Sequence, residues 1–344
     1  MESPEYLRMS LAAAMTLKFK NGLFYRNAKS PCLNVLLTYE NGCRGNCSYC
    51  GLSIKRPGEY NDKSFIRVGW DAYKLDEIMD SMSNNIEKIS RVCISMITNT
   101  KSTQDTIKLT KLFINKFNIP VSLLIAPTIL NKYNLFEFKE SGADRIGISI
   151  DCATKEIFEK YRGKFVNGPH NWDKYWNCFE EAVPMFGKDR VGVHLIVGLG
   201  ETEMEMINVI QKVRNYGGFT HLFSFFPESD SMLAELKAPE ISHYRRIQLA
   251  RYLIDEDLSS IDEFTFNKSG RLISIDMPKK TLIEYIESGK PFLTSGCPDK
   301  DGNIACNRPF SNSKPSEEIR NFPFLPDKND IKIITEELAD LINS

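Results

Sequence analysis

Short apolar runs alternate with longer amphipathic segments through most of this chain, a pattern typical of repeated βα units. Runs rich in β-branched residues predict strands at residues 34–40, 91–97, 120–126, 145–151, 190–197, 220–226 and 263–267. Helical spacing of apolar positions predicts helices at residues 72–87, 103–117, 129–140, 173–186, 201–215 and 241–255. Strands that alternate with helices pair in parallel, so the pattern predicts an α/β protein.

The number of these units narrows the architecture. Six or more βα units over roughly 250 residues fit a TIM-type (β/α) barrel, closed or partly closed, whose chemistry lies at the C-terminal ends of its strands. A doubly wound open sheet fits the same spacing. We expect residues 34–288 to form the barrel, after an N-terminal segment at residues 1–33.

The pattern changes after residue 288. Residues 289–330 are dense in Gly, Pro, Asn and Ser and show no apolar period, so an irregular tail is expected over 289–344, closed by a helix at about 331–342. Long irregular segments are commonly linkers or functional caps. Two cysteines in this tail, Cys297 and Cys306, favour the cap.

Composition limits the partners and the compartment. The 344 residues include 44 basic and 45 acidic side chains, spread along the chain, which does not favour a nucleic-acid partner. The first 20 residues resemble neither a secretion signal nor a transit peptide, and no apolar run is long enough for a membrane span. We therefore expect a cytoplasmic protein, in which the nine cysteines are reduced and serve as metal ligands or core residues.

Three cysteines lie together in "ENGCRGNCSYCGLS", just after the first expected barrel strand: Cys43, Cys47 and Cys50. A structural zinc ion takes four ligands, and the next cysteine downstream is Cys93. Three thiolates on a [4Fe–4S] cluster leave one iron open for an external ligand. The spacing therefore favours an iron–sulfur cluster over a zinc loop.

The spacing C-x3-C-x2-C, with Tyr49 immediately before the third cysteine, resembles the radical S-adenosylmethionine superfamily, in particular its biotin-synthase-like branch. The resemblance covers about residues 34–270. It implies that the open iron chelates the amino and carboxylate groups of S-adenosylmethionine. One electron from the cluster then yields a 5′-deoxyadenosyl radical.

The same resemblance implies a set of residues for S-adenosylmethionine. They are Tyr49, Ser95, Met96, Ile97, Thr98, Ser149, Asp151, Lys174, Gly198 and Gly200. Backbone carbonyls of residues 95–98 would hold the methionyl amine, Ser149 and Asp151 the ribose, and Lys174 the methionyl carboxylate, with the glycine turn on the adenine side. Each assignment has an ordinary structural alternative. Residues 95–98 would simply end a buried strand, Asp151 would cap a helix, Lys174 would face solvent, and the two glycines would form a plain βα turn.

Biotin synthesis itself does not fit. Biotin synthases hold a [2Fe–2S] sulfur donor on three strand cysteines and one arginine. Cys93 matches the first position, but Leu124 or its neighbour, Gly192 and Phe266 stand at or near the others. That donor cluster cannot be built here.

The tail "SGCPDKDGNIACNRPF" resembles instead the paired lipoyl synthases, in which an auxiliary [4Fe–4S] cluster is consumed as the sulfur source. The alternatives for Cys297 and Cys306 are an inert thiol pair or a zinc clip. By resemblance Cys32 is the first choice for a third ligand and Cys93 the second, and the serines Ser295, Ser311 and Ser313 lie nearby in sequence. Seven extended residues after Cys32 cover about 23 Å. Cys32 is therefore expected near the barrel end opposite Cys43, and the tail would have to wrap the barrel to reach it.

These observations predict a radical S-adenosylmethionine sulfurtransferase, one component of a lipoyl synthase that inserts sulfur into a protein-bound octanoyl-lysine chain. The expected partners are an octanoylated lipoyl-carrier protein, a second radical lipoyl synthase component and an electron donor such as ferredoxin or flavodoxin, with no nucleic acid and no membrane. No side chain is expected to act as a general acid or base. Cys152 and Cys178 are expected to be core thiols, and His194 to point into the barrel.

Two alternatives stay open. One is another biotin-synthase-like enzyme, a cofactor maturase or a mutase, with no sulfur insertion. The other is a binding or electron-transfer protein that cleaves no S-adenosylmethionine.

Overall fold

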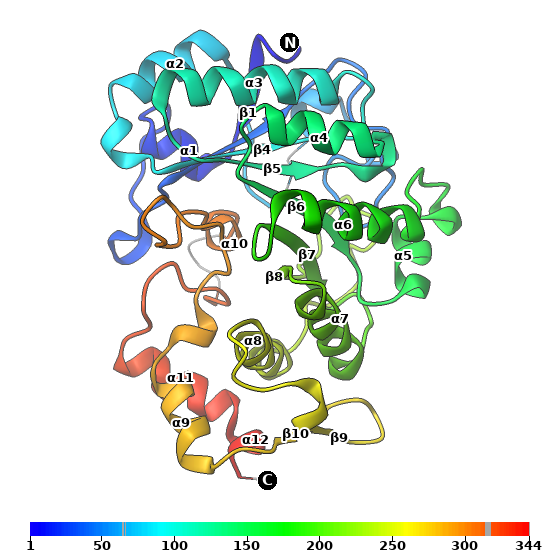
Figure 1. The fold of residues 1–344 in the computed structure, drawn as a ribbon, viewed down its shortest axis with the longest axis vertical. Coiled ribbons are helices and arrows are strands. Elements are labelled where there is room, and N and C mark those ends of the chain that lie inside the picture. Colours follow the sequence, from blue (N-terminus) through cyan, green and yellow to red (C-terminus); the bar gives the residue numbers. More distant parts are fainter. Residues whose placement is uncertain (64, 66, 314–317, 344) are drawn as a thin grey trace.

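Eight strands form one mostly parallel sheet in the computed structural model, which describes residues 1–63, 65, 67–313 and 318–343 (Figure 1). The strands are β1 (Tyr6–Met9), β2 (Cys32–Leu37), β3 (Ala72–Lys74), β4 (Arg91–Ser95), β5 (Val121–Ile125), β6 (Arg145–Asp151), β7 (Val191–Val197) and β8 (Phe219–Ser224). Their order is β3-β1-β2-β4-β5-β6-β7-β8. Neighbours from β2 to β8 are parallel, whereas β1 is antiparallel to both β2 and β3.

Helices follow most strands. The α-helices are α1 (Leu11–Thr16), α2 (Leu75–Ser83), α3 (Ser102–Phe117), α4 (Lys132–Glu140), α5 (Lys155–Tyr161), α6 (Trp172–Phe186), α7 (Glu203–Asn215), α8 (Ile241–Asp255), α9 (Lys279–Glu287), α10 (Arg308–Ser311), α11 (Lys328–Glu337) and α12 (Ala339–Ile342). Short 3₁₀ turns lie at Tyr25–Asn27, Tyr60–Asp62, Ile86–Lys88, Pro127–Ile129, Lys164–Val166, Ile261–Glu263 and Lys290–Phe292.

The strands of the sheet are buried on both faces and are mostly apolar. Every residue of β2, β4 and β5 is buried, as is typical of a parallel sheet with helices on its outer face. Figure 1 shows α3, α4 and α6 along the outside of this sheet, and α3 contacts β4 and β5 while α6 contacts β6 and β7. The α/β class and the parallel sheet are therefore confirmed.

Closure into a barrel is not seen in the strand pairing. No pairing joins β8 to β3 within the described ranges, so the hydrogen-bonded sheet has two edges. The predicted strand at 263–267 is not part of this sheet. It forms β9 (Phe264–Phe266), which pairs only with β10 (Leu272–Ile275) in a separate antiparallel hairpin. The prediction of a seventh strand in the barrel was wrong, because a short apolar run does not specify its partner.

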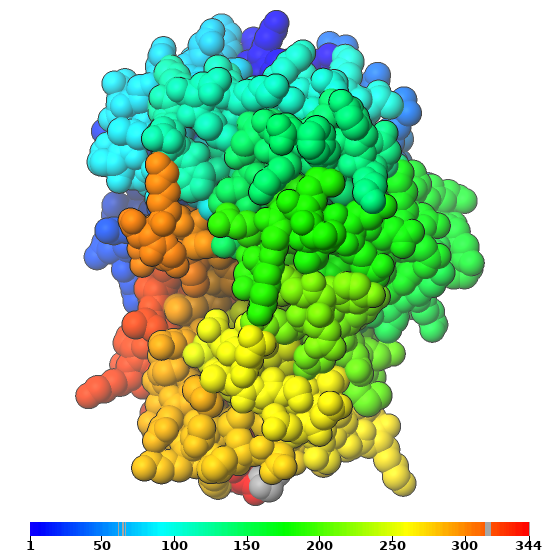
Figure 2. All heavy atoms as spheres, in the orientation of Figure 1, coloured from blue at the N-terminus to red at the C-terminus, as the bar shows by residue number. Residues whose placement is uncertain are grey.

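Two regions differ from the expected outline. Residues 1–33 were expected only as a segment ahead of the barrel, yet β1 adds a strand to the sheet beside β2. The tail was expected to be irregular up to its last helix, and it also contains α10, which contacts β8. Figure 2 shows the orange part of the tail against the cyan and green parts of the sheet domain. No helix in the described part of the chain is long and apolar enough to cross a membrane.

Candidate functional site

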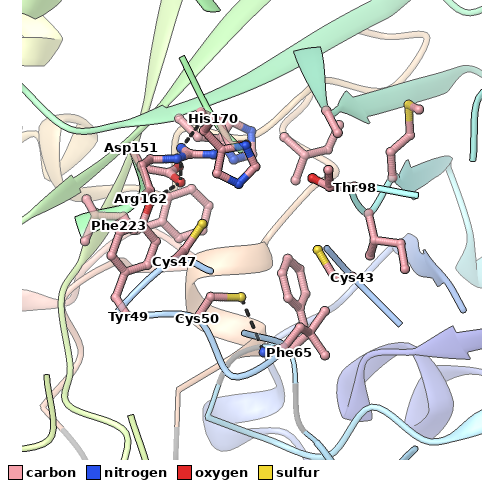
Figure 3. Close-up of a pocket in the computed structure, with 18 of the residues that line it drawn as sticks. Cys43, Cys47, Tyr49, Cys50, Phe65, Thr98, Asp151, Arg162, His170 and Phe223 are labelled. Atoms are coloured by element: carbon pink, nitrogen blue, oxygen red, sulfur yellow. Dashed lines mark hydrogen bonds and ion pairs between the residues drawn. The ribbon is translucent and has the colours of Figure 1, made fainter. Parts of the chain in front are cut away.

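The three-cysteine loop leaves the C-terminal end of β2 and lines a cavity of about 190 Å³ (Figure 3). Cys43, Cys47 and Cys50 are half-buried in its wall. Backbone N–H groups point at two of the sulfurs, from Gly45 to Cys43 (3.3 Å) and from Leu52 to Cys50 (3.4 Å). Burial raises the pKa of Cys47 to about 12, so this thiol stays protonated at neutral pH unless a metal displaces the proton.

The ends of five parallel strands form the rest of this cavity, at the edge where α/β sheets place their chemistry. The lining includes Met96, Ile97 and Thr98 after β4, Leu124 and Ile125 of β5, Ser149 and Asp151 of β6, His194 and Ile196 of β7, and Phe223 of β8. Six of the residues assigned to S-adenosylmethionine are thus brought together with the three cysteines. They are Tyr49, Met96, Ile97, Thr98, Ser149 and Asp151.

Asp151 is held in an unusual conformation at the end of β6. Its φ is +65°, in the left-handed region that non-glycine residues rarely adopt, and such strain is found preferentially at functional sites. Tyr49 donates a hydrogen bond from its hydroxyl to Asp151 Oδ2 (2.7 Å), and Arg162 Nη1 pairs with the same oxygen (2.6 Å). These contacts fix the carboxylate in the cavity wall beside the cysteine loop.

Arg162 was missed by the sequence analysis. It caps the C-terminus of α5, is 3% exposed, and donates to the backbone carbonyls of Ser149 and Ile150 as well as to Asp151. Its positive charge also lowers the pKa of Cys47, which partly opposes the larger effect of burial. The seven-residue helix α5 was not predicted, so nothing in the sequence placed this arginine at the site.

A polar cluster lies behind Arg162. His170 Nδ1 is 2.6 Å from the Thr128 hydroxyl and 3.0 Å from that of Tyr175, and the Tyr175 hydroxyl accepts from Arg162 Nη2 (3.2 Å). Burial lowers the pKa of His170, which keeps the ring neutral. His170 and Tyr175 both line the cavity, and neither was identified from the sequence.

Lys174 and Ser95 lie outside this cavity. Lys174 Nζ donates to the carbonyl of Thr128 (2.8 Å), and its side chain lines a separate hollow between α4 and α6. Ser95 is fully buried below the cavity and accepts a hydrogen bond from Arg308 (2.7 Å).

Gly198 and Gly200 form the turn after β7 and do not line the cavity either. Both have positive φ, and a Cβ on Gly198 would lie 2.6 Å from Pro239. The carboxylate of Glu201 accepts from the N–H of Gly198 (2.6 Å), which fixes the turn. The two glycines shape the backbone behind β7.

Four other cysteines form a second group, which is buried deeper in the protein. Cys32 of β2, Cys93 of β4 and the tail residues Cys297 and Cys306 pack against one another and are at most 9% exposed. The thiols of Cys306 and Cys32 both donate to Asn34 Oδ1 (3.6 and 3.8 Å). Cys32 and Cys93, the two candidates for a further ligand beside Cys297 and Cys306, therefore both belong to this group.

A tight turn brings the two tail cysteines together although eight residues separate them. The N–H groups of Ala305 and Cys306 both donate to the carbonyl of Cys297 (3.0 and 3.1 Å). Gly296 is required at this crossing, because a Cβ there would lie 1.8 Å from the Cys306 carbonyl oxygen. The eight residues between Cys297 and Cys306 therefore do not keep the two side chains apart.

The three serines near the tail cysteines have other partners. The hydroxyl of Ser295 accepts from the N–H of Leu222 (3.2 Å), that of Ser311 lies 3.2 Å from Ser30, and that of Ser313 donates to Pro309 (3.0 Å). Ser295 also lines the small cavity that Cys93, Cys297 and Cys306 line.

Cysteine thiolates are ligands of both zinc ions and iron–sulfur clusters. No group of three or more His, Cys, Asp or Glu side chains within the described ranges is arranged to hold a single metal ion. A zinc ion draws each thiolate to about 2.3 Å from itself. A [4Fe–4S] cubane instead binds one thiolate at each iron.

Comparison with known proteins gives one family. Residues 38–213, slightly more than half of the chain, match the model of the Radical SAM superfamily. No curated protein matches this sequence.

Two solved structures of the FeFe-hydrogenase maturase HydG resemble the fold. The first, from Carboxydothermus hydrogenoformans, has 17% sequence identity and a TM-score of 0.50, and the match covers 96% of this chain and 70% of that one. The second has 14% identity and a TM-score of 0.51, and covers 79% of this chain and 58%, less than two thirds, of that one. At these identities the similarity concerns the fold alone.

Proposed function

This chain belongs to the radical SAM superfamily, and we propose that it is a sulfurtransferase of the biotin-synthase-like branch, one component of a lipoyl synthase. Its substrate is an octanoyl-lysine chain on a carrier protein. The observation that supports this function is the buried group of Cys32, Cys93, Cys297 and Cys306 next to the cavity of the three-cysteine loop.

The cavity residues prepare the radical step. A [4Fe–4S] cluster on Cys43, Cys47 and Cys50, together with S-adenosylmethionine, supplies a 5′-deoxyadenosyl radical when both are bound. The N–H groups of Gly45 and Leu52 point at the sulfurs of Cys43 and Cys50 and would donate to them in the bound cluster. The described hydrogen bonds of Asp151 all use Oδ2, which leaves Oδ1 for a ribose hydroxyl.

The two cysteine groups are adjacent, because the cavities beside them share lining residues. Two neighbouring cavities share four lining residues: Leu124, His194, Phe223 and Arg308. The upper cavity is the one lined by the three-cysteine loop, and the smaller one is lined by Cys93, Cys297 and Cys306. Cys93 precedes Met96 by three positions, which is about 10 Å along a strand. An extended acyl chain in the upper cavity therefore has the deeper group within reach.

Sulfur insertion breaks one carbon–hydrogen bond and forms one carbon–sulfur bond. A hydrogen atom moves from an octanoyl carbon to the 5′-deoxyadenosyl radical and gives 5′-deoxyadenosine. Cys32, Cys93, Cys297 and Cys306 would hold an auxiliary [4Fe–4S] cluster, which would supply a sulfide for the carbon–sulfur bond to the carbon radical and would keep the one remaining electron on its iron. The protein keeps water away from the radical, since the lining of both cavities is largely apolar.

Reconstitution tests this function. The anaerobically reconstituted chain is mixed with a reductant, S-adenosylmethionine, an octanoylated carrier protein and a candidate second lipoyl synthase component, and the carrier is analysed by mass spectrometry. We expect a thiolated octanoyl chain. If 5′-deoxyadenosine forms freely but the carrier stays unmodified with the partner present, the lipoyl assignment fails while the radical activity remains.

The alternative is a biotin-synthase-like maturase or mutase without sulfur insertion, in which the four deeper cysteines are core thiols. This alternative needs one cluster, and therefore about four irons per chain instead of about eight. Metal analysis separates the two.

A further inference from the structure

Arg308 is buried against the four deeper cysteines. It begins α10, two residues after Cys306, and is 2% exposed. Its Nη2 donates to Cys93 Sγ (3.4 Å) and to the Ser95 hydroxyl (2.7 Å), and Nε and Nη2 both approach Asn34 Oδ1 (3.3 and 3.2 Å). Three neighbours thus hold the guanidinium plane in one orientation.

The partners of Arg308 do not balance its charge. All of them are neutral, no ion pair to Arg308 occurs in the described part of the chain, and its Nη1 is buried there without a hydrogen-bond partner. Arg91, which also borders the group, is by contrast paired with Asp144 (2.7 Å). A buried cation with neither a counter-ion nor a full set of acceptors is costly unless a negative group completes its surroundings.

The cysteines are the groups that face this charge. Arg308 interacts electrostatically with Cys93, Cys306, Cys32 and Cys297. As neutral thiols they offer it little, but as thiolates on a cubane they form an anionic centre, because four negative charges exceed the charge of the iron–sulfide core. The position of Arg308 is therefore explained by a bound anionic cluster.

We propose that Arg308 compensates the charge of an auxiliary iron–sulfur cluster on Cys32, Cys93, Cys297 and Cys306, with Nη1 donating to a cluster sulfide or thiolate, and thereby raises its reduction potential. The reduced cluster carries one more negative charge than the oxidised one, so a fixed cation in a low-dielectric interior favours the reduced state. Net charge and hydrogen bonds to sulfur are main determinants of such potentials.

This role rests on the cluster of the proposed function but not on its substrate. In the sulfur-insertion step one electron stays on the cluster for each carbon–sulfur bond formed. A cation beside the cluster favours that outcome, because it stabilises the more negative product. The charge role can nevertheless be measured without any octanoyl substrate, so failure of the lipoyl assignment and failure of the Arg308 assignment are separate results.

The test isolates the auxiliary cluster. In the full-length chain, Cys43, Cys47 and Cys50 are replaced by alanine, so that only the deeper cluster remains, and its reduction is followed by electron paramagnetic resonance in a redox titration. Arg308→Gln keeps hydrogen-bond donors without the charge, Arg308→Met removes both, and Arg308→Lys keeps the charge. Arg26→Gln, which removes a cation from the Asp330 ion pair instead, is the matched control. Iron content and circular dichroism report cluster retention and folding.

We expect the ratio of reduced to oxidised cluster at a fixed potential to fall at least tenfold in the Gln and Met variants, about 59 mV for a one-electron couple. The Lys and Arg26 variants should shift much less. Loss of iron from folded Gln and Met variants but not from Lys would also support charge compensation. Unchanged potentials in the neutral variants, or loss of iron from all three Arg308 variants, would overturn it. Absence of an auxiliary cluster in the parent chain would overturn it together with the sulfur-donor function.

Discussion

The thiol of Cys306, in the C-terminal tail, lies against that of Cys32, the first residue of β2. The two residues come from opposite ends of the chain, so this contact fixes the tail across the sheet. Cys93 joins them from β4, the strand that pairs with β2. The tail therefore owes part of its position to the four-cysteine group, and its chemistry can be separated from that of the three-cysteine loop by mutation.

Replacement of any one of Cys43, Cys47 and Cys50 by alanine should abolish formation of 5′-deoxyadenosine. Two thiolates cannot hold a cubane that presents an open iron to the cavity. The product is measured by chromatography after anaerobic reconstitution and reduction. Cys178→Ala is the control, because this buried thiol lies in α6 outside both groups. A wild-type rate in any of the three loop variants would contradict the cofactor assignment.

Iron content should report two clusters. The reconstituted wild type is expected to hold about eight irons per chain, and the Cys297→Ala/Cys306→Ala variant about four. Because Cys32 and Cys93 complete the same group, replacing these two together should also leave about four. Metal analysis and Mössbauer spectroscopy check both values, and Cys178→Ala should retain the full content. Equal iron in the wild type and the tail variant would show that the tail cysteines are not ligands.

Asp151→Asn should weaken binding of S-adenosylmethionine by roughly ten- to hundredfold without loss of iron. The carboxylate oriented by Tyr49 and Arg162 is assigned to the ribose, and a hydrogen bond to a charged group contributes about 1.5–3 kcal/mol. Tyr49→Phe should have a smaller effect, since it removes only one of the two groups that orient Asp151. Affinity is measured by equilibrium dialysis of the reconstituted protein. Unaltered affinity in Asp151→Asn would remove this residue from the site.

Substitutions of Lys174 and Arg162 test whether the assignment made from the sequence or the arrangement in the structure identifies the residue that affects S-adenosylmethionine binding. Lys174→Ala should leave the affinity for S-adenosylmethionine within about twofold of wild type, because Nζ is bound to the Thr128 carbonyl outside the cavity. Arg162→Gln should reduce it, since this side chain lines the cavity and pairs with Asp151. The reverse order of effects would restore the methionyl carboxylate to Lys174.

Local patterns explain which parts of the site could be predicted. The spacing of Cys43, Cys47 and Cys50 and the β-branched runs are properties of short segments, and Ser149 and Asp151 follow from the end of a predicted strand. Arg162 could not be placed, because α5 is too short to give a helical period. The position of Lys174 was assigned correctly to a helix, but the direction of its side chain depends on α4 and α6 together.

The four-cysteine group depends on contacts across the whole chain. Cys32 and Cys93 lie on neighbouring strands, a relationship that follows from the order of the sheet. Their meeting with Cys297 and Cys306 requires the tail to return past β8, and no periodicity in a Gly- and Pro-rich segment specifies such a path. Sequence could name the candidates, whereas only the folded chain brings them together.

Finally, the tail variants should uncouple the two halves of the proposed reaction. Cys297→Ala/Cys306→Ala is expected to cleave S-adenosylmethionine at a rate close to wild type, because the cavity of Cys43, Cys47 and Cys50 contains neither residue. It should yield no thiolated octanoyl product, because the carbon radical then has no sulfide beside it and can only be quenched or regain hydrogen. Parallel measurement of 5′-deoxyadenosine and of the carrier's mass, with the candidate partner present, checks both expectations. Cys178→Ala should give both products. Thiolation that persists in the tail variant would assign the sulfur to another source, and loss of cleavage together with thiolation would show that the tail supports the upper cavity itself.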